Sequence, residues 1–174
     1  MVETFFFQIQ CAGVILQDVE KKGIYMTKQS VIWHQPLELQ QLNERGKGTA
    51  VENMGIEVTE IGDDYLKGTM PVDERTKQPM GLLHGGSSVL LAETLGSIAA
   101  NFSVNREKAY CVGMEINANH LRSVCAGVVT GVAKPVHMGR STQDWEIKIY
   151  DQKERLICIS RLTMAIVQKA QASG

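Results

Sequence analysis

The sequence predicts an α+β fold in which an antiparallel β-sheet wraps around one long central α-helix. Three observations lead to it: a pair of short strand patterns, then one long apolar helix pattern, then four longer strand patterns. Strands that follow one another directly in the chain pair antiparallel. A helix that is apolar nearly all round needs a sheet to cover one side and something else to cover the other.

The composition is that of an ordinary globular protein, with 44% hydrophobic and 21% charged residues among 174. A formal net charge of −1 without a dense Lys/Arg block argues against nucleic-acid binding through phosphates. No apolar run is long enough to span a membrane. The cysteines have neither CxxC spacing nor metal-ligand spacing with histidine, so we expect reduced thiols, a cytoplasmic protein and no metal. They are Cys11, Cys111, Cys125 and Cys158.

The chain before residue 54 is expected to precede the main domain. Residues 1–25 fit poorly with the patterns in the rest of the chain, and we predict that they are an upstream extension outside the fold. Their apolar run over 5–16 has no Lys or Arg before it and no small-x-small cleavage site after it, so secretion is not expected. Residues 26–53 are predicted as a short helical lead-in, because 37–45 has a helical pattern that Gly46 ends.

The main domain is predicted over 54–168, with a tail at 169–174. A strand pattern over 54–61, a turn at 62–64 and a returning pattern over 65–72 indicate a hairpin. The one long helix is predicted over 82–102. The remaining strand patterns cover 109–120, 127–135, 141–150 and 156–168.

The stretch 78–105 contains only two ionisable side chains, His84 and Glu93. Burying a lone carboxylate costs free energy unless something pairs with it or uses it. On the same helix face only Ser97, at i+4, can form a hydrogen bond to Glu93. Glu93 is therefore a candidate for chemistry, and the alternative is a buried acid capped by solvent or by an Arg from elsewhere.

Two glycines, Gly85 and Gly86, stand where the chain turns into the predicted helix. Glycine lets a ligand approach the backbone closely, and the first N–H groups of a helix carry partial positive charge. Such a place suits an oxyanion or a polarised carbonyl. The same glycines also suit a tight turn beneath a packed helix, and His84 alone is explained by orienting that turn.

Gly85 and Glu93 lie about 12 Å apart along the helix axis. They cannot meet around one reacting carbon within one chain. Two chains that pack these helices antiparallel across a two-fold axis would bring Glu93 of one chain to Gly85 of the other. We therefore expect a homodimer.

The segment 78–97 resembles the active-site segment of hotdog-fold acyl-CoA thioesterases, in the branch with a Glu on the central helix. Its residues read Gln78-Pro-x-Gly-Leu-Leu-His84-Gly85-Gly86-x-Ser88-x-x-x-Ala-Glu93-x-x-Gly-Ser97. Three further segments match, and the resemblance extends over about 31–167. They read Met70-Pro-Val-Asp73-x-Arg75-Thr-x-Gln-Pro79, Glu115-Ile-Asn-Ala-Asn-His120 and Lys134-Pro-x-His137-x-Gly139.

The resemblance implies the hotdog fold and a role for each matching position. Glu93 would be the nucleophile or the general base, and the Gly85 N–H would polarise the thioester carbonyl. Gln78 would form a hydrogen bond near the acyl carbonyl. His84 would hold the substrate or the lytic water, and Ser97 would orient Glu93.

Substrate-binding positions are implied by the same resemblance. His120 would lie on the opposing strand, near the pantetheine or acyl end. Cations suit phosphates, so a group of residues is expected at the nucleotide end of coenzyme A. These are Arg122, His137, Gly139, Arg140 and Ser141.

The implied activity is hydrolysis of acyl-CoA thioesters, without a bound cofactor, by a homodimer that pairs into a homotetramer. Similar bacterial proteins release 1,4-dihydroxy-2-naphthoate from coenzyme A in menaquinone synthesis or clear misloaded aryl groups from a siderophore carrier protein. The segment 115–123 favours the first. A non-catalytic acyl-CoA sensor is one alternative, but 1–53 shows neither a helix-turn-helix pattern nor a basic surface. A dehydratase is the other, and it would use a catalytic His in a different helix pattern.

Overall fold

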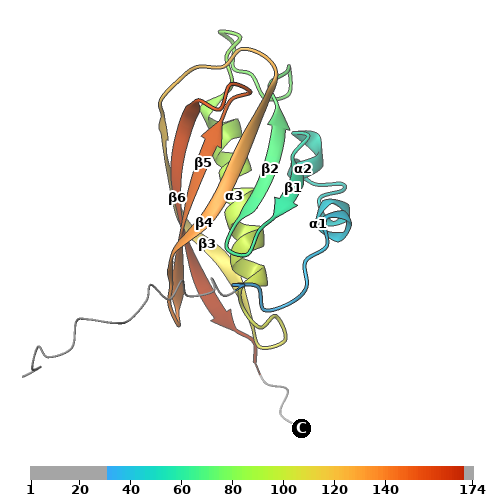
Figure 1. Ribbon diagram of the computed structural model, residues 1–174, viewed down its shortest axis with the longest axis vertical. Helices are drawn as coiled ribbons and strands as arrows, with labels where there is room; N and C mark the ends of the chain where they lie inside the picture. Colours follow the sequence, from blue (N-terminus) through green and yellow to red (C-terminus); the bar gives the residue numbers. More distant parts are fainter. Residues whose placement is uncertain (1–30, 171–174) are drawn as a thin grey trace, which may run out of the picture.

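In residues 31–170, which the computed structural model describes, six strands form one antiparallel sheet and one long helix, α3 (Gly85–Phe102), packs against it (Figure 1). The strands follow the order β1-β2-β4-β5-β6-β3 across the sheet. The predicted α+β arrangement is confirmed, while the predicted extension over 1–25 lies outside the described residues. The other elements are α1 (Leu39–Arg45), α2 (Ala50–Asn53), β1 (Glu57–Ile61), β2 (Leu66–Pro71), β3 (Ala109–His120), β4 (Val128–Met138), β5 (Thr142–Tyr150) and β6 (Leu156–Gln168).

The observed elements differ from the predicted ones at three places. α3 begins at Gly85 rather than at 82, because Leu83 pairs with Lys77 in an isolated bridge and His84 caps the helix. β4 continues to Met138, since its ladder with β5 resumes after an irregularity that follows Pro135. The short helix α2 was not expected, although the side chain of Thr49 caps it by accepting from the Val51 N–H.

One face of α3 is buried against the sheet. Leu95 on this face is fully buried, and it fits over two glycines that pair with each other across β2 and β4, Gly68 and Gly131. A Cβ atom at either glycine would lie 2.7 Å from a Leu95 methyl carbon. The paired glycines therefore let the helix approach the sheet closely. The other fully buried apolar residues of this face are Leu91, Ala92, Ala99 and Ala100.

The opposite face of α3 is covered only in part, by the segment before β1. Asn43 of α1 holds this segment on β1, because its side-chain amide donates to Val58 O (3.0 Å) and accepts from Val58 N–H (2.8 Å). The Trp33 indole N–H donates to Gly62 O at 2.7 Å. Glu93 and Ser97 on this face remain partly exposed.

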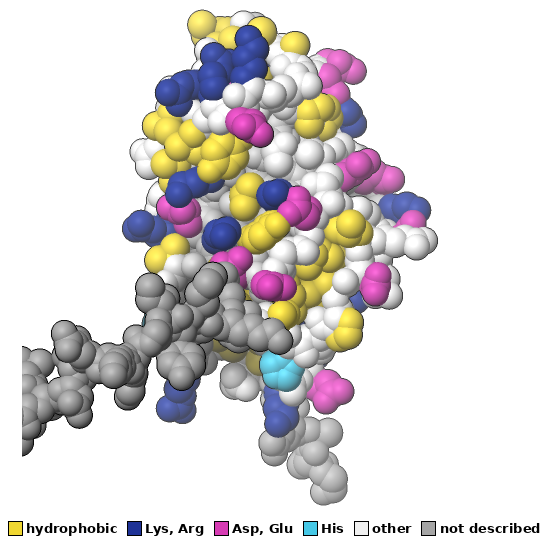
Figure 2. Space-filling view, in the orientation of Figure 1, with side chains coloured by type: hydrophobic (Ala, Val, Ile, Leu, Met, Phe, Trp, Pro, Cys, Tyr) yellow, Lys and Arg dark blue, Asp and Glu magenta, His cyan; other side chains and the backbone are white. Residues whose placement is uncertain are grey.

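Acidic and basic side chains are interspersed over the outer face of the sheet (Figure 2). Lys and Arg gather toward the end of the molecule at which α3 begins (Figures 1 and 2). Within the described chain, no helix is long and apolar enough to cross a membrane.

Candidate active site

His84 organises the start of α3. Its Nδ1 accepts from the Gly86 N–H at 2.8 Å, and its carbonyl oxygen accepts from the N–H groups of Ser87 (3.0 Å) and Ser88 (3.2 Å). The Ser88 bond is the first regular helical one, and the His84 N–H donates to Thr76 O at 2.9 Å, so three of the four N–H groups that a helix start leaves unpaired are satisfied. Among residues 31–170, no acceptor is found for the fourth, the Gly85 N–H. One backbone donor with partial positive charge is therefore available to a ligand.

The cap also fixes the state of the His84 ring. A ring nitrogen that accepts a hydrogen bond carries no proton, so Nδ1 is the bare nitrogen and Nε2 carries the hydrogen. The imidazole is exposed in the single chain. His84 therefore presents an Nε2–H donor next to the Gly85 N–H, which suits the predicted contact with substrate or water.

The helix start is anchored by a residue that was not predicted from the sequence, Thr76. Its carbonyl oxygen accepts from the His84 N–H (2.9 Å) and from the Ser87 hydroxyl (3.0 Å). Its own hydroxyl donates to Pro71 O at 2.8 Å and accepts from the Asp73 N–H at 3.1 Å. Thr76 is fully buried and joins the end of β2 to the start of α3. The Asp73-x-x-Thr76 spacing, typical of a side-chain-bonded turn, is the sequence signal that could have found it.

A pocket of about 340 Å³ lies at this helix start and contains four of the predicted residues. The ring of His120, at the end of β3, lies against Gly85, because a Cβ atom on Gly85 would be 2.8 Å from its Nε2. The Gln78 side-chain oxygen accepts from the Met80 N–H, which leaves the Gln78 amide NH₂ as the group able to donate. Arg122 donates to Leu156 O from the same pocket wall.

Glu93 lines a second pocket, of about 450 Å³, on the open face of α3. The two pockets share no residue. The walls of the Glu93 pocket are mostly apolar, with Leu90 and Ile98 from α3 and Leu42 from α1. The donor at the helix start and the acid in the middle of the helix thus occupy separate pockets of one chain.

Glu93 is partly exposed, and in the described chain its carboxylate has neither an ion-pair nor a hydrogen-bond partner. It lies against β3 at Gly113, where a Cβ atom would be 3.0 Å from Glu93 Oε1. The β3–β6 register shifts between Gly113 and Glu115, and a bulge there bends the strand beside the carboxylate. A carboxylate left without a partner at an apolar pocket can accept a proton or attack an electrophile.

Ser97 does not contact Glu93 as predicted. Its hydroxyl donates to the Met164 sulfur at 3.8 Å, and within the described chain no Ser97–Glu93 hydrogen bond is present. Asn101 lies one turn further along the helix and pins α3 to β3. Its side chain accepts from the Cys111 N–H at 2.9 Å and donates to Cys111 O at 3.0 Å.

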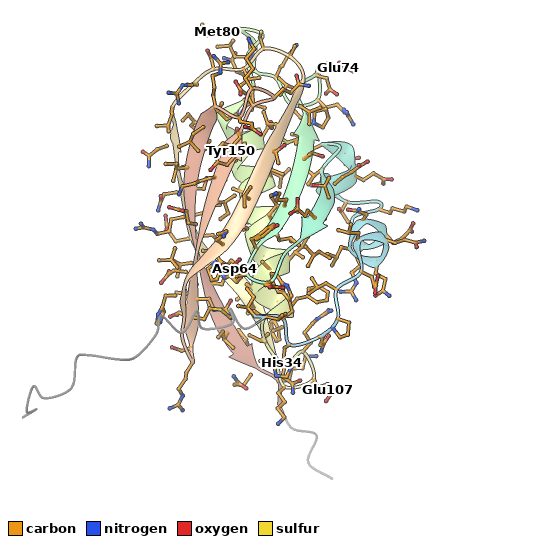
Figure 3. All side chains as sticks on the ribbon, in the orientation of Figure 1. His34, Asp64, Glu74, Met80, Glu107 and Tyr150 are labelled. Atoms are coloured by element: carbon orange, nitrogen blue, oxygen red, sulfur yellow. The ribbon has the colours of Figure 1, made fainter. Side chains whose placement is uncertain are left out.

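The predicted nucleotide-binding residues separate into two groups. Arg122 is at the start of α3, whereas the β4–β5 turn with His137 and Arg140 is at its end, where Gln143 donates to Ser103 at 2.9 Å. Figure 3 marks these ends by Met80, in the turn before α3, and Glu107, in the loop after it. The two groups therefore lie apart within the described chain, and the expectation that they meet the nucleotide end of coenzyme A stays a prediction. His137, near the end of β4, lies against Gly139, since a Cβ atom on Gly139 would be 2.8 Å from His137 Nε2. Ser141, in the turn that follows, is exposed.

Known proteins match this chain in sequence and in structure. Residues 80–158 match the thioesterase superfamily. The 1,4-dihydroxy-2-naphthoyl-CoA hydrolase of Escherichia coli is 53% identical over 79% of this chain and 100% of its own length. The proofreading thioesterase EntH of Cronobacter turicensis is 52% identical over 79% of this chain and 99% of its own.

A crystal structure of a thioesterase from Haemophilus influenzae superimposes with a TM-score of 0.78 at 43% identity, covering 82% of this chain and 99% of that one. The sheet, the single long helix and the segment from Gln78 to Ser97 agree with this likeness. The predicted family, fold and enzyme class are confirmed. The chain belongs to the thioesterase superfamily and is a hotdog-fold thioesterase.

Proposed function

We propose that this thioesterase hydrolyses aryl-CoA thioesters, with 1,4-dihydroxy-2-naphthoyl-CoA of menaquinone synthesis as its leading substrate. The observation that carries the proposal is Glu93, a carboxylate without a partner in the described chain at the wall of an apolar pocket. An aromatic acyl group fits such a pocket, and its carbonyl carbon would lie at the carboxylate. The E. coli relative named for this substrate supports the choice of acyl group.

In the proposed reaction the thioester carbonyl carbon lies between Glu93 and the Gly85 N–H. Glu93 either attacks this carbon or takes a proton from the water that attacks it. The Gly85 N–H and the Gln78 amide donate to the carbonyl oxygen as negative charge develops on it. If Glu93 acts as the base, the carbon–sulfur bond breaks after water has added to the carbonyl carbon. If Glu93 attacks, the carbon–sulfur bond breaks to leave a mixed anhydride on Glu93, which water then hydrolyses. In both cases the thiolate of coenzyme A takes a proton and the acyl group leaves as a carboxylic acid.

The proposal requires two chains, because Gly85 and Glu93 lie in separate pockets about 12 Å apart along one helix. β3 offers the means to join them. It is an edge strand of the described sheet, with Tyr110, Val112 and Met114 exposed at 42%, 42% and 63%. A long apolar edge strand needs a cover, and a second copy of β3 can supply it by antiparallel pairing.

The contacts of β3 suggest the register of that pairing. Glu93 lies against Gly113, and Gly85 lies against His120. Because Met114 is an extra residue at the irregularity in β3, a two-fold axis at Asn117 would pair Ile116 with Ala118 and place Gly113 of one chain opposite His120 of the other. Each Glu93 would then face the Gly85 of the partner chain, giving two equivalent sites per dimer. Pairing of two dimers into a homotetramer is part of the proposal and is tested by light scattering on the purified protein.

Coenzyme A would reach the site along the pocket at the start of α3. His120 and Arg122 line this pocket with Gly85, and the Arg122 guanidinium suits a phosphate. A carrier-protein thioester is the second candidate substrate, favoured by the 52% identity to the proofreading thioesterase EntH. Both substrates present the same pantetheine thioester, so a comparison of kcat/KM for the same aryl group on the two carriers separates them.

The test is steady-state hydrolysis of benzoyl-, hydroxynaphthoyl- and fatty acyl-CoA by the wild type and by Glu93→Gln. The amide keeps the size of the side chain and removes the base, so we expect kcat to fall by about a thousandfold or more with the melting temperature unchanged. Glu74→Gln, which changes an exposed acid in the turn after β2, is the matched control and keeps full activity. Near-normal kcat in Glu93→Gln would overturn the mechanism.

A further inference from the structure

The pocket that begins at Glu93 has two arginines at its other end. Both lie over the Phe102 ring, with the guanidinium carbon of Arg106 4.7 Å and that of Arg45 5.4 Å from the ring centroid. All three residues line the pocket together with Glu93. Arg45 comes from α1 and Arg106 from the loop after α3, so the two cations reach this ring from different parts of the chain.

Neither guanidinium has an acidic partner in the described chain. The neighbouring acid Glu44 pairs with Lys47 at 2.7 Å. The acid that lines the pocket itself is Glu93. It lies nine residues before Phe102, about 13 Å along the helix axis. Arg106 is half-buried and Arg45 is exposed. Contact with an aromatic ring restrains a guanidinium and leaves its N–H groups able to donate to a ligand.

A pair of fixed guanidiniums is suited to a carboxylate, which can accept two parallel hydrogen bonds from an arginine. The wall between Glu93 and the arginines is mostly apolar, with residues such as Leu42 and Ile98. The phosphates and amides of coenzyme A do not match such a wall, whereas the carbon skeleton of an acyl group does. The arginines therefore lie where the far end of the acyl group would be.

We propose that Arg45 and Arg106 select acyl groups that carry a carboxylate at the end remote from the thioester. This inference rests on the proposed function, because it takes the Glu93 pocket as the acyl site. It adds a second substrate class to that function, aryl thioesters with an apolar body and a remote carboxylate, which the 1,4-dihydroxy-2-naphthoyl group lacks. Phe102 is a positioning residue in this arrangement, since it holds both cations without contacting the thioester.

The test compares 6-carboxy-2-naphthoyl-CoA with 6-methyl-2-naphthoyl-CoA, which differ only in the charge of the remote group. The readout is the ratio of kcat/KM for the two substrates, measured for the wild type, Arg45→Gln, Arg106→Gln and the double variant. We expect the wild-type ratio to favour the carboxylate about tenfold or more, mainly through KM, and each single substitution to remove most of that preference. Lys47→Gln removes the same charge two residues after Arg45, from a residue outside this pocket, and keeps the ratio.

Dissociation constants of both thioesters, measured by calorimetry with Glu93→Gln, test the same contact without turnover. A wild type that hydrolyses the methyl substrate but shows no preference, or a ratio that Lys47→Gln lowers as much as Arg45→Gln, overturns this inference and leaves the proposed function intact. Absence of hydrolysis with either substrate overturns the proposed function. In that case tighter binding of the carboxylate that depends on Arg45 still supports the arginine contact, and equal binding overturns it.

Discussion

The start of α3 and its middle both hold groups suited to a thioester, but their surroundings differ. At the start, the backbone is held by hydrogen bonds to His84 and Thr76, and one donor, the Gly85 N–H, is left over. In the middle, Glu93 has no hydrogen-bond or ion-pair partner within the described chain and lies at an apolar pocket. The start of the helix therefore offers a fixed hydrogen-bond donor, and its middle offers a carboxylate that has no partner within the described chain. Each region is half of a site, and substitutions in each half test whether the two act together.

After Glu93→Gln, the largest effect is expected where the leftover donor is removed. Proline at Gly85 deletes the N–H, and the position tolerates it, because it is the first helical residue and His84 has the extended ψ of 133° that a residue before proline needs. Alanine at Gly85 adds the same Cβ against His120 but keeps the N–H. We expect kcat of Gly85→Pro to fall about a hundredfold below that of Gly85→Ala. Equal kcat values for the two variants would mean that the Gly85 N–H takes no part in the mechanism.

Co-assembly of two inactive variants shows whether the halves come from different chains. Glu93→Gln and Gly85→Pro are each nearly inactive, and random co-assembly of the two variants regenerates intact sites only if Glu93 and Gly85 belong to different subunits. About a quarter of the sites would then be intact, so the mixture should show about a quarter of the wild-type rate. The measurement is activity after co-expression and joint purification, with the two variants mixed after separate folding as control. Activity no higher than in this control would place both halves in one chain.

The sequence was sufficient for the main elements because their patterns reflect burial directly. The alternation in 145–150 predicted a strand, and the residues of β5 alternate between buried and half-buried positions along its whole length. The glycines before the long helix predicted a backbone donor, and Gly85 supplies it. The lone acid at 93 left two interpretations open, a site or a capped acid, and Glu93 has no ion-pair partner within the described chain.

What the sequence could not predict depends on contacts between distant residues. Ser97 donates to Met164, 67 residues later, and helical spacing alone pointed it to Glu93. Arg122 and the turn at 137–141 carry similar side chains, yet the sheet order places them at opposite ends of α3. Phe102 meets Arg45 only because α1 lies near the end of α3, 57 residues later in the chain. No local pattern records such pairings.

The two faces of α3 also differ, with a smaller expected effect. Leu95 is fully buried over the glycines of β2 and β4, whereas Ile98 is partly exposed on the open face. Leu95→Ala should lower the free energy of unfolding by about 3 kcal/mol because the cavity cannot close against the sheet, and Ile98→Ala by about 1 kcal/mol. Denaturant unfolding of both variants measures this difference. Equal losses would mean that the open face is as tightly packed as the sheet side.

The smallest difference concerns the thiols near the two ends of α3. Burial raises the pKa of Cys111, whose Sγ lies 3.4 Å from Ala100 O near the helix end, to about 11. Burial also raises the pKa of Cys158 in β6. The thiolate is the reactive form, so at pH 8 only about one Cys111 side chain in a thousand is reactive at any moment.

Cys125 is exposed in the loop between β3 and β4. We expect iodoacetamide to label Cys125 before Cys111 and Cys158, with mass spectrometry of the digested protein as the measurement. Raising the pH toward 11 should speed the labelling of Cys111 strongly, because most of its thiolate forms as the pH approaches its raised pKa of about 11. Labelling of Cys111 as fast as Cys125 at pH 8 would mean that the contact between β3 and the end of α3 opens readily in solution.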